Sequence, residues 1–432
     1  MNDNKLNVFW FRRDLRWDDN HALYLALSEK IPVLPVFIFD RNILDELPKN
    51  DHRVSLIYNR LSELNLLAAN QHASGIFIFN GKPAEAFEFL TQKYPINKVF
   101  ANEDYEPYAA QRDSEIQQLL DRKEIELILV RDHIILSLDE IKSDSGDIYR
   151  VYTPFSKKWK SIFDPAIHLK HYPSEQLLKN LMKLPADWHF PSLQEIGFKP
   201  STIQYHPFDF QEMKKIISNY HLTRDNFSFE KGTTNVSTAL RFGLISIRKL
   251  FKMALNNQKY LNELIWREFF QYLIYHFPFT VKDYFRQIDI PLENSEAYFE
   301  KWKNASTGVP IIDAAMHQLN STGYMHNRLR MVVANYLTKI LWIDWRWGER
   351  YFAEKLFDFE LASNVGNWQW AAGTGADAAP YFRIFNPWLQ QQKFDPNHVY
   401  LKKWLPYDLE DAPKPIVDFS ERRNLYLKMM KK

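Results

Sequence analysis

The sequence predicts an α/β domain built on a parallel sheet, followed by an all-α domain. Three observations lead to this prediction. Short apolar or β-branched runs alternate with helical patterns over residues 1–132. Helical patterns alone continue from Phe208 onward. Nine of the thirteen tryptophans lie between Trp266 and Trp404, which assigns any aromatic chemistry to the second domain.

The first domain is predicted from runs of strand-forming residues separated by amphipathic segments. The strands are expected at Val8–Phe11, Val33–Phe39, Gly75–Phe79, Lys98–Ala101 and Ile125–Val130. The helices are expected near Asn20–Glu29, Arg53–Gln71, Pro83–Lys93 and Pro107–Arg122. This strict alternation is typical of crossover connections and so of a Rossmann-like parallel sheet. No G-x-G-x-x-G motif follows the first strand, so the sequence does not support a dinucleotide-binding site at this place.

A charged turn follows the first predicted strand. Its polar side chains are Arg12, Arg13, Asp14, Arg16, Asp18 and Asn20. Open α/β sheets bind ligands at the carboxyl ends of their strands, which is one interpretation of this turn. The alternative is a turn that fixes the sheet by salt bridges.

The pattern weakens after the last predicted strand. Seven prolines between Pro154 and Pro207 interrupt the segment, and aromatic residues lie among them. We therefore predict a connector, packed down on the protein surface, because long loose connectors are uncommon. The predicted ranges are 1–132 for the α/β domain, 133–207 for the connector and 208–432 for the helical domain.

Composition excludes several classes of protein. The 432 residues contain no cysteine, which excludes a disulfide framework and thiolate metal sites. There is neither a run of 18 apolar residues nor a signal-peptide pattern, so we expect a cytoplasmic protein without membrane segments. A net charge of +2 does not by itself demand a nucleic-acid partner.

The segment Asp358–Pro387 organises the second domain. Its tryptophans Trp368 and Trp370 are two positions apart, which places the two rings about 200° apart around a helix. One helix could then present one indole to a cofactor and the other to a second ligand. Small residues follow, and they allow the backbone to approach a flat group closely. From the residues alone, a packed core helix followed by a turn remains the alternative.

This segment closely resembles the flavin-binding region of the photolyase/cryptochrome family, through its NVGNWQWAAGTGADAAPYFRIFNP run. It is most similar to the bacterial class I photolyases that repair cyclobutane pyrimidine dimers. FWFRRDLRWDDNHAL near the start and VYTPFSKKWK at Val151–Lys160 resemble further family segments. The resemblance implies an N-terminal antenna domain and a C-terminal helical domain that binds FAD and carries out catalysis.

The resemblance also implies a function, which is the light-driven splitting of cyclobutane pyrimidine dimers by electron transfer from reduced FAD. Such an enzyme is a deoxyribodipyrimidine photo-lyase. Its partner is UV-damaged DNA, and we expect a monomer in the bacterial cytoplasm, associated with the nucleoid. A blue-light photoreceptor (a cryptochrome) of the same fold is the alternative. No metal is required.

The implied FAD site combines a hydroxyl-rich run with residues of the organising segment. From the residues alone, hydroxyls at a helix start suit either a phosphate or ordinary helix capping. Asn364 occupies the place of the asparagine that class I photolyases have beside the flavin N5, which favours repair over signalling. The implied cofactor residues are Tyr220, Thr233, Thr234, Asn235, Val236, Ser237, Arg267, Arg330, Asp358, Phe359, Glu360 and Asn364. The resemblance also implies that Arg330 pairs with Asp358 against the flavin ring.

The implied substrate site begins at LNELIWREFF. Glu263, Trp266 and Arg267 have the i, i+3, i+4 spacing of one helix face, which indicates either a polar pocket wall or a surface pair of Glu263 with Arg267. The implied catalytic residues are Glu263, Trp266, Asn327, Met331 and Trp370. The implied DNA contacts are Arg224, Glu263, Trp266, Arg267, Asn327, Arg328 and Gln390.

Two features depart from the family pattern. Trp345 and Trp368 match the inner members of the family's electron-transfer chain, but the outer position falls at Leu292. The candidate substitutes are Trp302, Trp342, Trp347 and Tyr298. A second antenna chromophore, of folate or deazaflavin type, stays undecided: Lys282 matches a folate-pocket lysine, whereas Ala109 replaces a glutamate of folate-binding members.

Overall fold

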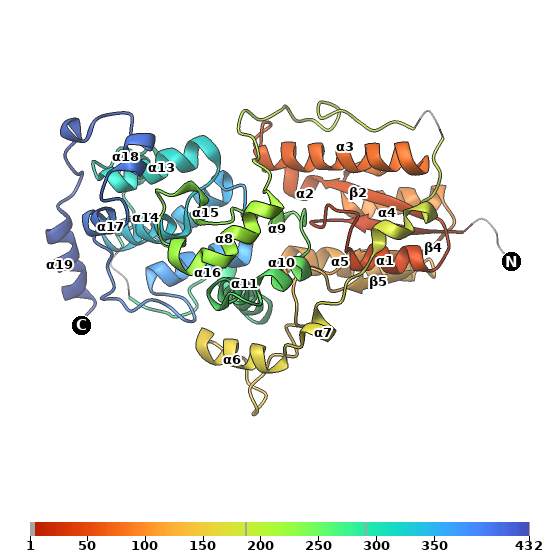
Figure 1. The fold of residues 1–432 in the computed structure, drawn as a ribbon, viewed down its shortest axis with the longest axis horizontal. Helices are drawn as coiled ribbons and strands as arrows, with labels where there is room; N and C mark the ends of the chain where they lie inside the picture. The colour runs from red at the N-terminus through yellow and green to blue at the C-terminus, as the bar shows by residue number, and fades with distance from the viewer. Residues whose placement is uncertain (1–4, 186–187, 290–291, 432) are drawn as a thin grey trace. The chain divides into compact units, whose positions relative to one another are not determined.

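The computed structural model describes residues 5–185, 188–289 and 292–431. The chain forms two compact units, each made of several segments (Figure 1). Unit 1 contains the chain up to Glu140, Ile162–Pro207 and Val236–Met253. Unit 2 contains Ile141–Ser161, Phe208–Asn235 and the chain from Ala254 onward.

Unit 1 is built on a parallel sheet with strand order β3-β2-β1-β4-β5 in the described residues. Its strands are β1 (Leu6–Phe11), β2 (Val33–Asp40), β3 (Phe77–Gly81), β4 (Ile96–Asn102) and β5 (Glu126–Val130). Its helices are α1 (His21–Ser28), α2 (Arg41–Leu44), α3 (His52–His72), α4 (Pro83–Lys93), α5 (Pro107–Asp121), α7 (Pro165–His168), η1 (Ser174–Asn180), α9 (Ser237–Arg241) and α10 (Ile247–Ala254). The predicted parallel α/β sheet is thus confirmed, with each strand and helix within a few residues of its expected range.

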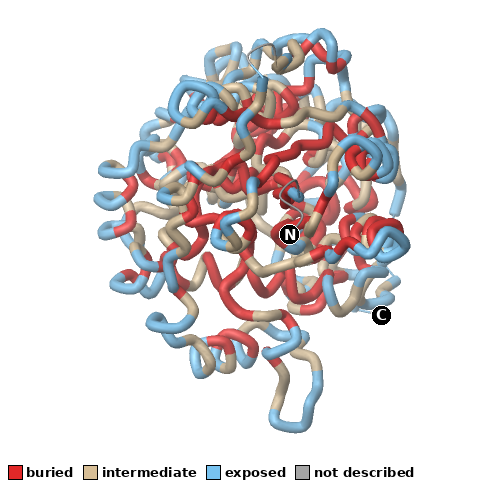
Figure 2. Tube along the Cα trace, turned by 90° about the vertical axis from the view of Figure 1, so that its right-hand side faces the viewer, coloured by how far each residue is buried: buried red, intermediate tan, exposed pale blue. Residues whose placement is uncertain are grey.

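Local sequence explains these elements. Proline occupies the first helical position of both α4 and α5, where its missing N–H costs no intrahelical hydrogen bond. All six residues of β1 are buried, as expected for a central strand covered on both faces. Alternate residues of β1 point toward α4 and α5, where Val8 and Trp10 join a core that includes Phe87 and Leu120. In Figure 2 the helices alternate between buried and exposed colours along their turns.

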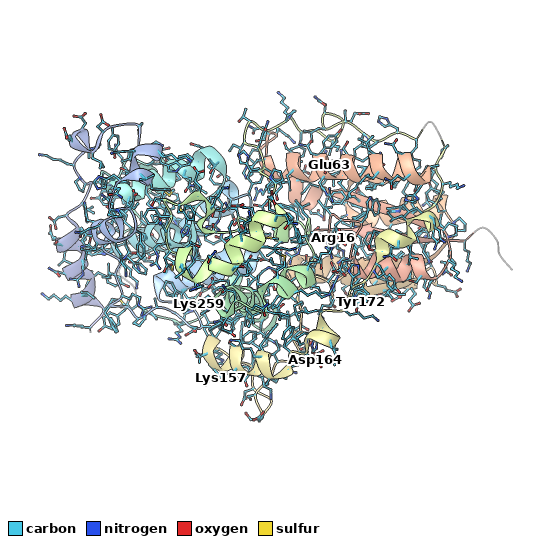
Figure 3. The ribbon with its side chains drawn as sticks, viewed as in Figure 1. Arg16, Glu63, Lys157, Asp164, Tyr172 and Lys259 are labelled. Carbon is cyan, nitrogen blue, oxygen red and sulfur yellow. The ribbon has the colours of Figure 1, made fainter. Side chains whose placement is uncertain are left out.

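The charged turn after β1 forms a buried network within unit 1. Arg12 pairs with Asp113 at 2.7 Å, and Arg16 pairs with Asp132 at 2.5 Å. The neighbouring Arg248 guanidinium and Arg16 itself hold the pKa of Asp132 far below its usual range, although burial opposes this. Figure 3 labels Arg16. The salt-bridge interpretation of this turn therefore holds, because its arginines pair with carboxylates of other segments of unit 1.

The predicted connector is not a separate layer. It contains α6 (Tyr152–Ile162) as well as α7 and η1, and it divides between the two units. Within unit 2, Trp159 of α6 donates its indole N–H to the buried Glu268 carboxylate at 2.7 Å. Residues 236–253, which we expected in the helical domain, belong to unit 1. Side-chain packing of segments distant in sequence decides these assignments.

Unit 2 is helical in its described residues, in agreement with the prediction. Besides α6 it contains α8 (Phe210–Thr223), η2 (Glu230–Gly232), α11 (Gln258–His276), η3 (Pro278–Val281), α12 (Glu296–Lys303), α13 (Pro310–Thr322), α14 (Asn327–Lys339), α15 (Trp345–Lys355), α16 (Leu361–Ala372), α17 (Pro387–Phe394), α18 (Val399–Trp404), η4 (Leu409–Asp411) and α19 (Phe419–Met429). The central helix is α16, which packs against α11, α14 and α15. No helix in the described part of the chain is long and apolar enough to cross a membrane.

Candidate functional site

Helix α16 separates two cavities of unit 2. Trp368 lines a polar cavity, and Trp370 lines an apolar one, as their two-residue spacing predicts. Glycines permit this close packing: a Cβ on Gly348 would lie 2.1 Å from the Trp368 ring, and one on Gly366 would lie 2.2 Å from the Phe270 ring. The small residues around α16 therefore bring its neighbours close enough to enclose both cavities.

The polar cavity gathers much of the predicted cofactor site. It encloses about 520 Å³ of space between atoms when its open mouth is counted. Its walls come from α14, from α15 and the residues after it, and from α16. The lining residues are Asn327, Arg330, Met331, Ala334, Phe352, Leu356, Asp358, Phe359, Glu360, Ser363, Asn364, Asn367 and Trp368.

A charged pair crosses this cavity. The Arg330 guanidinium donates to both carboxylate oxygens of Asp358, at 2.9 and 3.1 Å. Its Nε donates to the Met325 carbonyl at 2.8 Å. These three hydrogen bonds fix the guanidinium, and both members of the ion pair line the cavity. The pairing predicted from the resemblance is present in the structure.

Asn364 is held by Glu349, a residue that carries no signal in the sequence. Its amide Nδ2 donates to the Glu349 carbonyl at 3.0 Å and to the Glu349 carboxylate at 2.9 Å. Burial raises the pKa of Glu349. Both Nδ2 hydrogens are thereby engaged, which leaves the oxygen Oδ1 for a ligand. Asn364 is accordingly set to accept a hydrogen bond from a protonated ring nitrogen.

In the described structure, Arg267 and Glu263 each form an ion pair with a different residue. Arg267 pairs with Glu360 at 3.1 Å, and Gln271 donates to the same carboxylate at 2.8 Å. Glu263 pairs with Arg224 at 2.5 Å. The alternative of a surface pair between Glu263 and Arg267 is therefore not what the structure shows. Neither Glu263 nor Arg267 lines the described polar cavity.

Glu263 lies in a partly dry environment. Burial raises the pKa of its carboxyl, while Arg224 and Lys259 act in the opposite direction. Lys259 lies one turn earlier on α11 and is labelled in Figure 3. The net rise favours the protonated carboxyl, which can donate a hydrogen bond. In the structure its Oε1 accepts from Arg224, so Glu263 would have to bind a proton before it could donate to a carbonyl group.

The other predicted DNA contacts differ in their exposure. Asn327 is exposed at the start of α14, whereas Arg328 donates to Asp225 at 2.6 Å and lies over the Phe394 ring. Gln390 is half-buried on α17, and its side-chain oxygen has no hydrogen-bond partner in the described structure. The exposed amide of Asn327 is thus available, while Arg328 must exchange its partner to reach a phosphate.

The hydroxyl-rich run, residues 233–237, does not cap a helix through its side chains. Thr233 donates to Asn235, and Thr234 bonds with the Tyr260 hydroxyl at 3.0 Å. Asn235 has a φ of +50°, a conformation that asparagine tolerates well. Val236, which precedes α9, makes no side-chain cap, so the helix-capping interpretation fails. Val236 and Ser237 belong to unit 1, whereas the preceding residues of the run belong to unit 2.

Tyr220 is the remaining predicted cofactor residue. It lies on α8, and its ring meets the Tyr260 ring edge-on at 4.9 Å. Burial raises its pKa well above the usual range for tyrosine. Tyr220 does not line either of the two described cavities.

The aromatic residues around Trp368 form a continuous cluster. Of the candidate outer residues, Trp302 lies nearest, with its ring 6.1 Å from that of Trp368. Trp347 is further along, because Phe299 lies between it and Trp302. Trp345 is buried and faces Tyr284 at 6.4 Å. Leu292 is exposed.

Comparison with known proteins agrees with this geometry. Residues 7–174 match the DNA photolyase family model, and residues 260–413 match the FAD binding domain of DNA photolyase. A deoxyribodipyrimidine photo-lyase from Synechococcus sp. is 36% identical over 95% of this chain and 90% of its own length. The chain belongs to the DNA photolyase family. All the lining residues of the polar cavity lie within the matched FAD-binding range.

Solved photolyase structures share the fold over nearly the whole chain. A bacterial class III photolyase from Agrobacterium tumefaciens superimposes with a TM-score of 0.87 at 28% identity, covering 98% of this chain and 97% of that one. An archaeal photolyase from Sulfolobus tokodaii with two FAD molecules has a TM-score of 0.78 at 33% identity, covering 98% and 99%. In the present chain, the predicted residues Tyr220, Arg224 and 233–237 lie outside the two ranges matched by the family models.

The residues of the polar cavity suit a flavin. The paired Arg330 provides positive charge, the Asn364 oxygen provides an acceptor, and Trp368 and Phe359 provide flat apolar surface. FAD is the cofactor of the matched domain. Sequence reasoning missed Glu349 and Asp225. They carry no local motif, because each acts through a contact with a residue distant in sequence.

His326 makes the N-terminal cap of α14 sensitive to acid. Its ring accepts a hydrogen bond from the Arg328 N–H at 3.1 Å, which caps α14. Burial lowers the pKa of His326 to about 4. Between pH 6.5 and 4 the unfolded chain binds a proton that the folded chain does not, so stability falls as pH is lowered.

We expect this linkage to cost roughly 2 kcal/mol of unfolding free energy on going from pH 7 to pH 4.5. Urea unfolding of the wild type and of His326→Asn at both pH values checks this, because asparagine also caps helices but does not titrate. An equal loss of stability in both proteins would contradict it.

Proposed function

We propose that this protein splits cyclobutane pyrimidine dimers in UV-damaged DNA, driven by blue light and dependent on bound reduced FAD. The observation that carries the proposal is the polar cavity, which unites Arg330, Asp358, Asn364 and Trp368 within the matched FAD-binding range. The names of the curated relatives and their coverage of nearly the whole chain support it. A blue-light receptor is the alternative, and no contact of the described site favours it.

When bound and reduced, FAD would supply absorption of blue light and the reversible transfer of one electron to the dimer. The chain supplies the surroundings. Arg330, fixed by Asp358, places positive charge beside an anionic ring system, where a preorganised charge is worth most. Asn364 accepts from a ring N–H through Oδ1, because Glu349 occupies its donors.

The substrate side uses α11 and the start of α14. Glu263 donates a hydrogen bond to a dimer carbonyl, whose charge grows when the electron arrives. Trp266 and Trp370 offer flat surfaces to a dimer turned out of the stack, and Asn327 and Met331 complete the wall. Arg224, Arg267, Arg328 and Gln390 contact the DNA strand, and binding weakens with salt because phosphate contacts release counterions.

The finer assignments are also proposals. The helical unit 2 contains the catalytic FAD-binding domain, and residues 1–132 belong to the antenna domain. The hydroxyl run 233–237 with Tyr220 holds the FAD diphosphate, and Trp345 and Trp368 conduct electrons. A monomer is proposed as well. A DNA substrate supports a place in the cytoplasm with the nucleoid.

The test is repair of a defined thymine dimer in duplex and single-stranded DNA by the reduced protein, under blue light and in the dark. We expect light-dependent recovery of thymine absorbance, and none in the dark. A protein that retains FAD but splits no dimer in either kind of DNA overturns the proposal. The receptor alternative then takes its place.

A further inference from the structure

Tyr152, the first residue of α6, lies flat against Trp266 within unit 2. The two ring centroids are 3.6 Å apart, and the ring planes differ by only 6°. The residues are 114 positions apart in sequence, so this stack is a tertiary contact. Trp266 is half-buried, with Phe269 and Phe270 each 5.6 Å away.

Tyr152 is held at both ends. Its hydroxyl donates to the Asn262 carbonyl at 3.1 Å, one turn before Trp266 on α11. Its backbone N–H donates to the Asp377 carboxylate at 3.0 Å. Burial raises the pKa of Tyr152 to about 12, so the phenol keeps its proton at physiological pH. The ring is therefore fixed before any substrate arrives.

Asp377 connects this stack to the rest of the substrate side. It follows α16 and lines the apolar cavity together with Trp370 and Phe270. Glu263 also acts on the Tyr152 phenol, since its charge contributes to the raised pKa. One short segment at the start of α6 thus meets the helix that carries Glu263 and Trp266 and the loop that follows Trp370.

We propose that Tyr152 is a positioning residue that fixes the Trp266 indole in the orientation that receives the pyrimidine dimer. This inference rests on the proposed function. An unsupported indole on a helix surface must be ordered when a ligand binds, which lowers affinity, whereas a stacked indole is already ordered. With one face covered by Tyr152, Trp266 offers only its remaining exposed part to the substrate.

Ordinary core packing is the competing explanation, and the two make different predictions. If Tyr152 only packs in the core, its replacement lowers the free energy of unfolding whichever residue occupies position 266. If Tyr152 positions Trp266, its replacement lowers the affinity for dimer-containing DNA, and only in proteins that retain Trp266. A phenylalanine in place of Tyr152 preserves the stack and restores recognition.

The experiment measures binding in the dark of a labelled oligonucleotide with one thymine dimer, and of the same oligonucleotide without it, to the full FAD-loaded protein. We expect Tyr152→Ala to weaken dimer binding roughly three- to tenfold, the usual worth of an aromatic pair. Binding of undamaged DNA stays unchanged. Tyr152→Phe binds like the wild type, and Tyr152→Ala adds no loss in a Trp266→Ala background.

Tyr172→Ala is the matched control, because Tyr172 stacks on His21 in unit 1 with centroids 3.8 Å apart (Figure 3 labels Tyr172). It should leave dimer binding unchanged. Should Tyr152→Ala lose FAD or fail to fold, Asp377→Asn is used instead, since it keeps the ring and weakens its backbone anchor. A smaller loss, confined to dimer DNA, then supports the proposal.

The inference is overturned if Tyr152→Ala, or Asp377→Asn in its place, binds dimer DNA like the wild type. It is also overturned if damaged and undamaged DNA are affected equally, or if the loss persists without Trp266. A wild-type protein that does not prefer dimer DNA contradicts the proposed function itself, which separates the two failures.

Discussion

Replacing Glu263 by alanine is expected to slow light-driven dimer splitting roughly ten- to a hundredfold, because a hydrogen bond to a charged group contributes about 1.5–3 kcal/mol. The carboxyl lies 2.5 Å from Arg224, and burial raises its pKa. Its donated hydrogen bond strengthens as charge develops on the substrate, so the effect falls on the rate more than on binding. Single-turnover repair under calibrated blue light measures this.

Two variants control for general damage. Glu263→Gln keeps a hydrogen-bond donor and should retain most of the rate. Glu293→Ala breaks the pair of Glu293 with Arg422, an ion pair of 2.7 Å in the same unit with an exposed carboxylate, and should leave the rate unchanged. Equal repair rates in Glu263→Ala and in the wild type would show that this carboxyl does not take part.

Replacing Arg330 by methionine is expected to weaken FAD binding roughly a hundredfold, since hydrogen bonds to charged groups contribute about 1.5–3 kcal/mol each. The side chain of Asp358 is only 7% exposed, so the variant leaves a carboxylate without its partner beside the cavity. That negative charge also repels an anionic ring system. Titration of the apoprotein with FAD, followed by flavin fluorescence, gives the affinity.

Arg346→Met is the matched control for this effect. Arg346 pairs with Asp344 at 2.7 Å, and the side chain of Asp344 is also buried, but neither residue lines the polar cavity. This variant should lower thermal stability without changing FAD affinity. A similar loss of FAD in both variants would indicate general destabilisation of unit 2 rather than a role of Arg330 at the cofactor.

The candidate site was only partly accessible from sequence. The pairing of Arg330 with Asp358 followed from the resemblance, and the structure contains it. The partners of Glu263 and Arg267 did not follow, because helical spacing places both on one face of α11 but says nothing about Arg224 or Glu360. A charged side chain pairs with whichever opposite charge the tertiary packing brings within reach.

The structure of the connector was also only partly predictable from the sequence. Its prolines correctly indicate interrupted structure, yet α6 forms within it, and Trp159 is fixed by Glu268, which lies 109 residues later. Local propensity is a weak guide there, because a short amphipathic helix gains its stability from the surface that it covers.

The sequence by itself determined the parallel α/β sheet, the helical second unit and the opposite orientation of Trp368 and Trp370. These features depend on backbone periodicity, which repeats every two residues in a strand and every 3.6 in a helix. Only the tertiary structure decided that Glu349 occupies the donors of Asn364 and that Tyr152 stacks on Trp266. Each of these contacts joins separate elements, and its geometry depends on how their side chains pack.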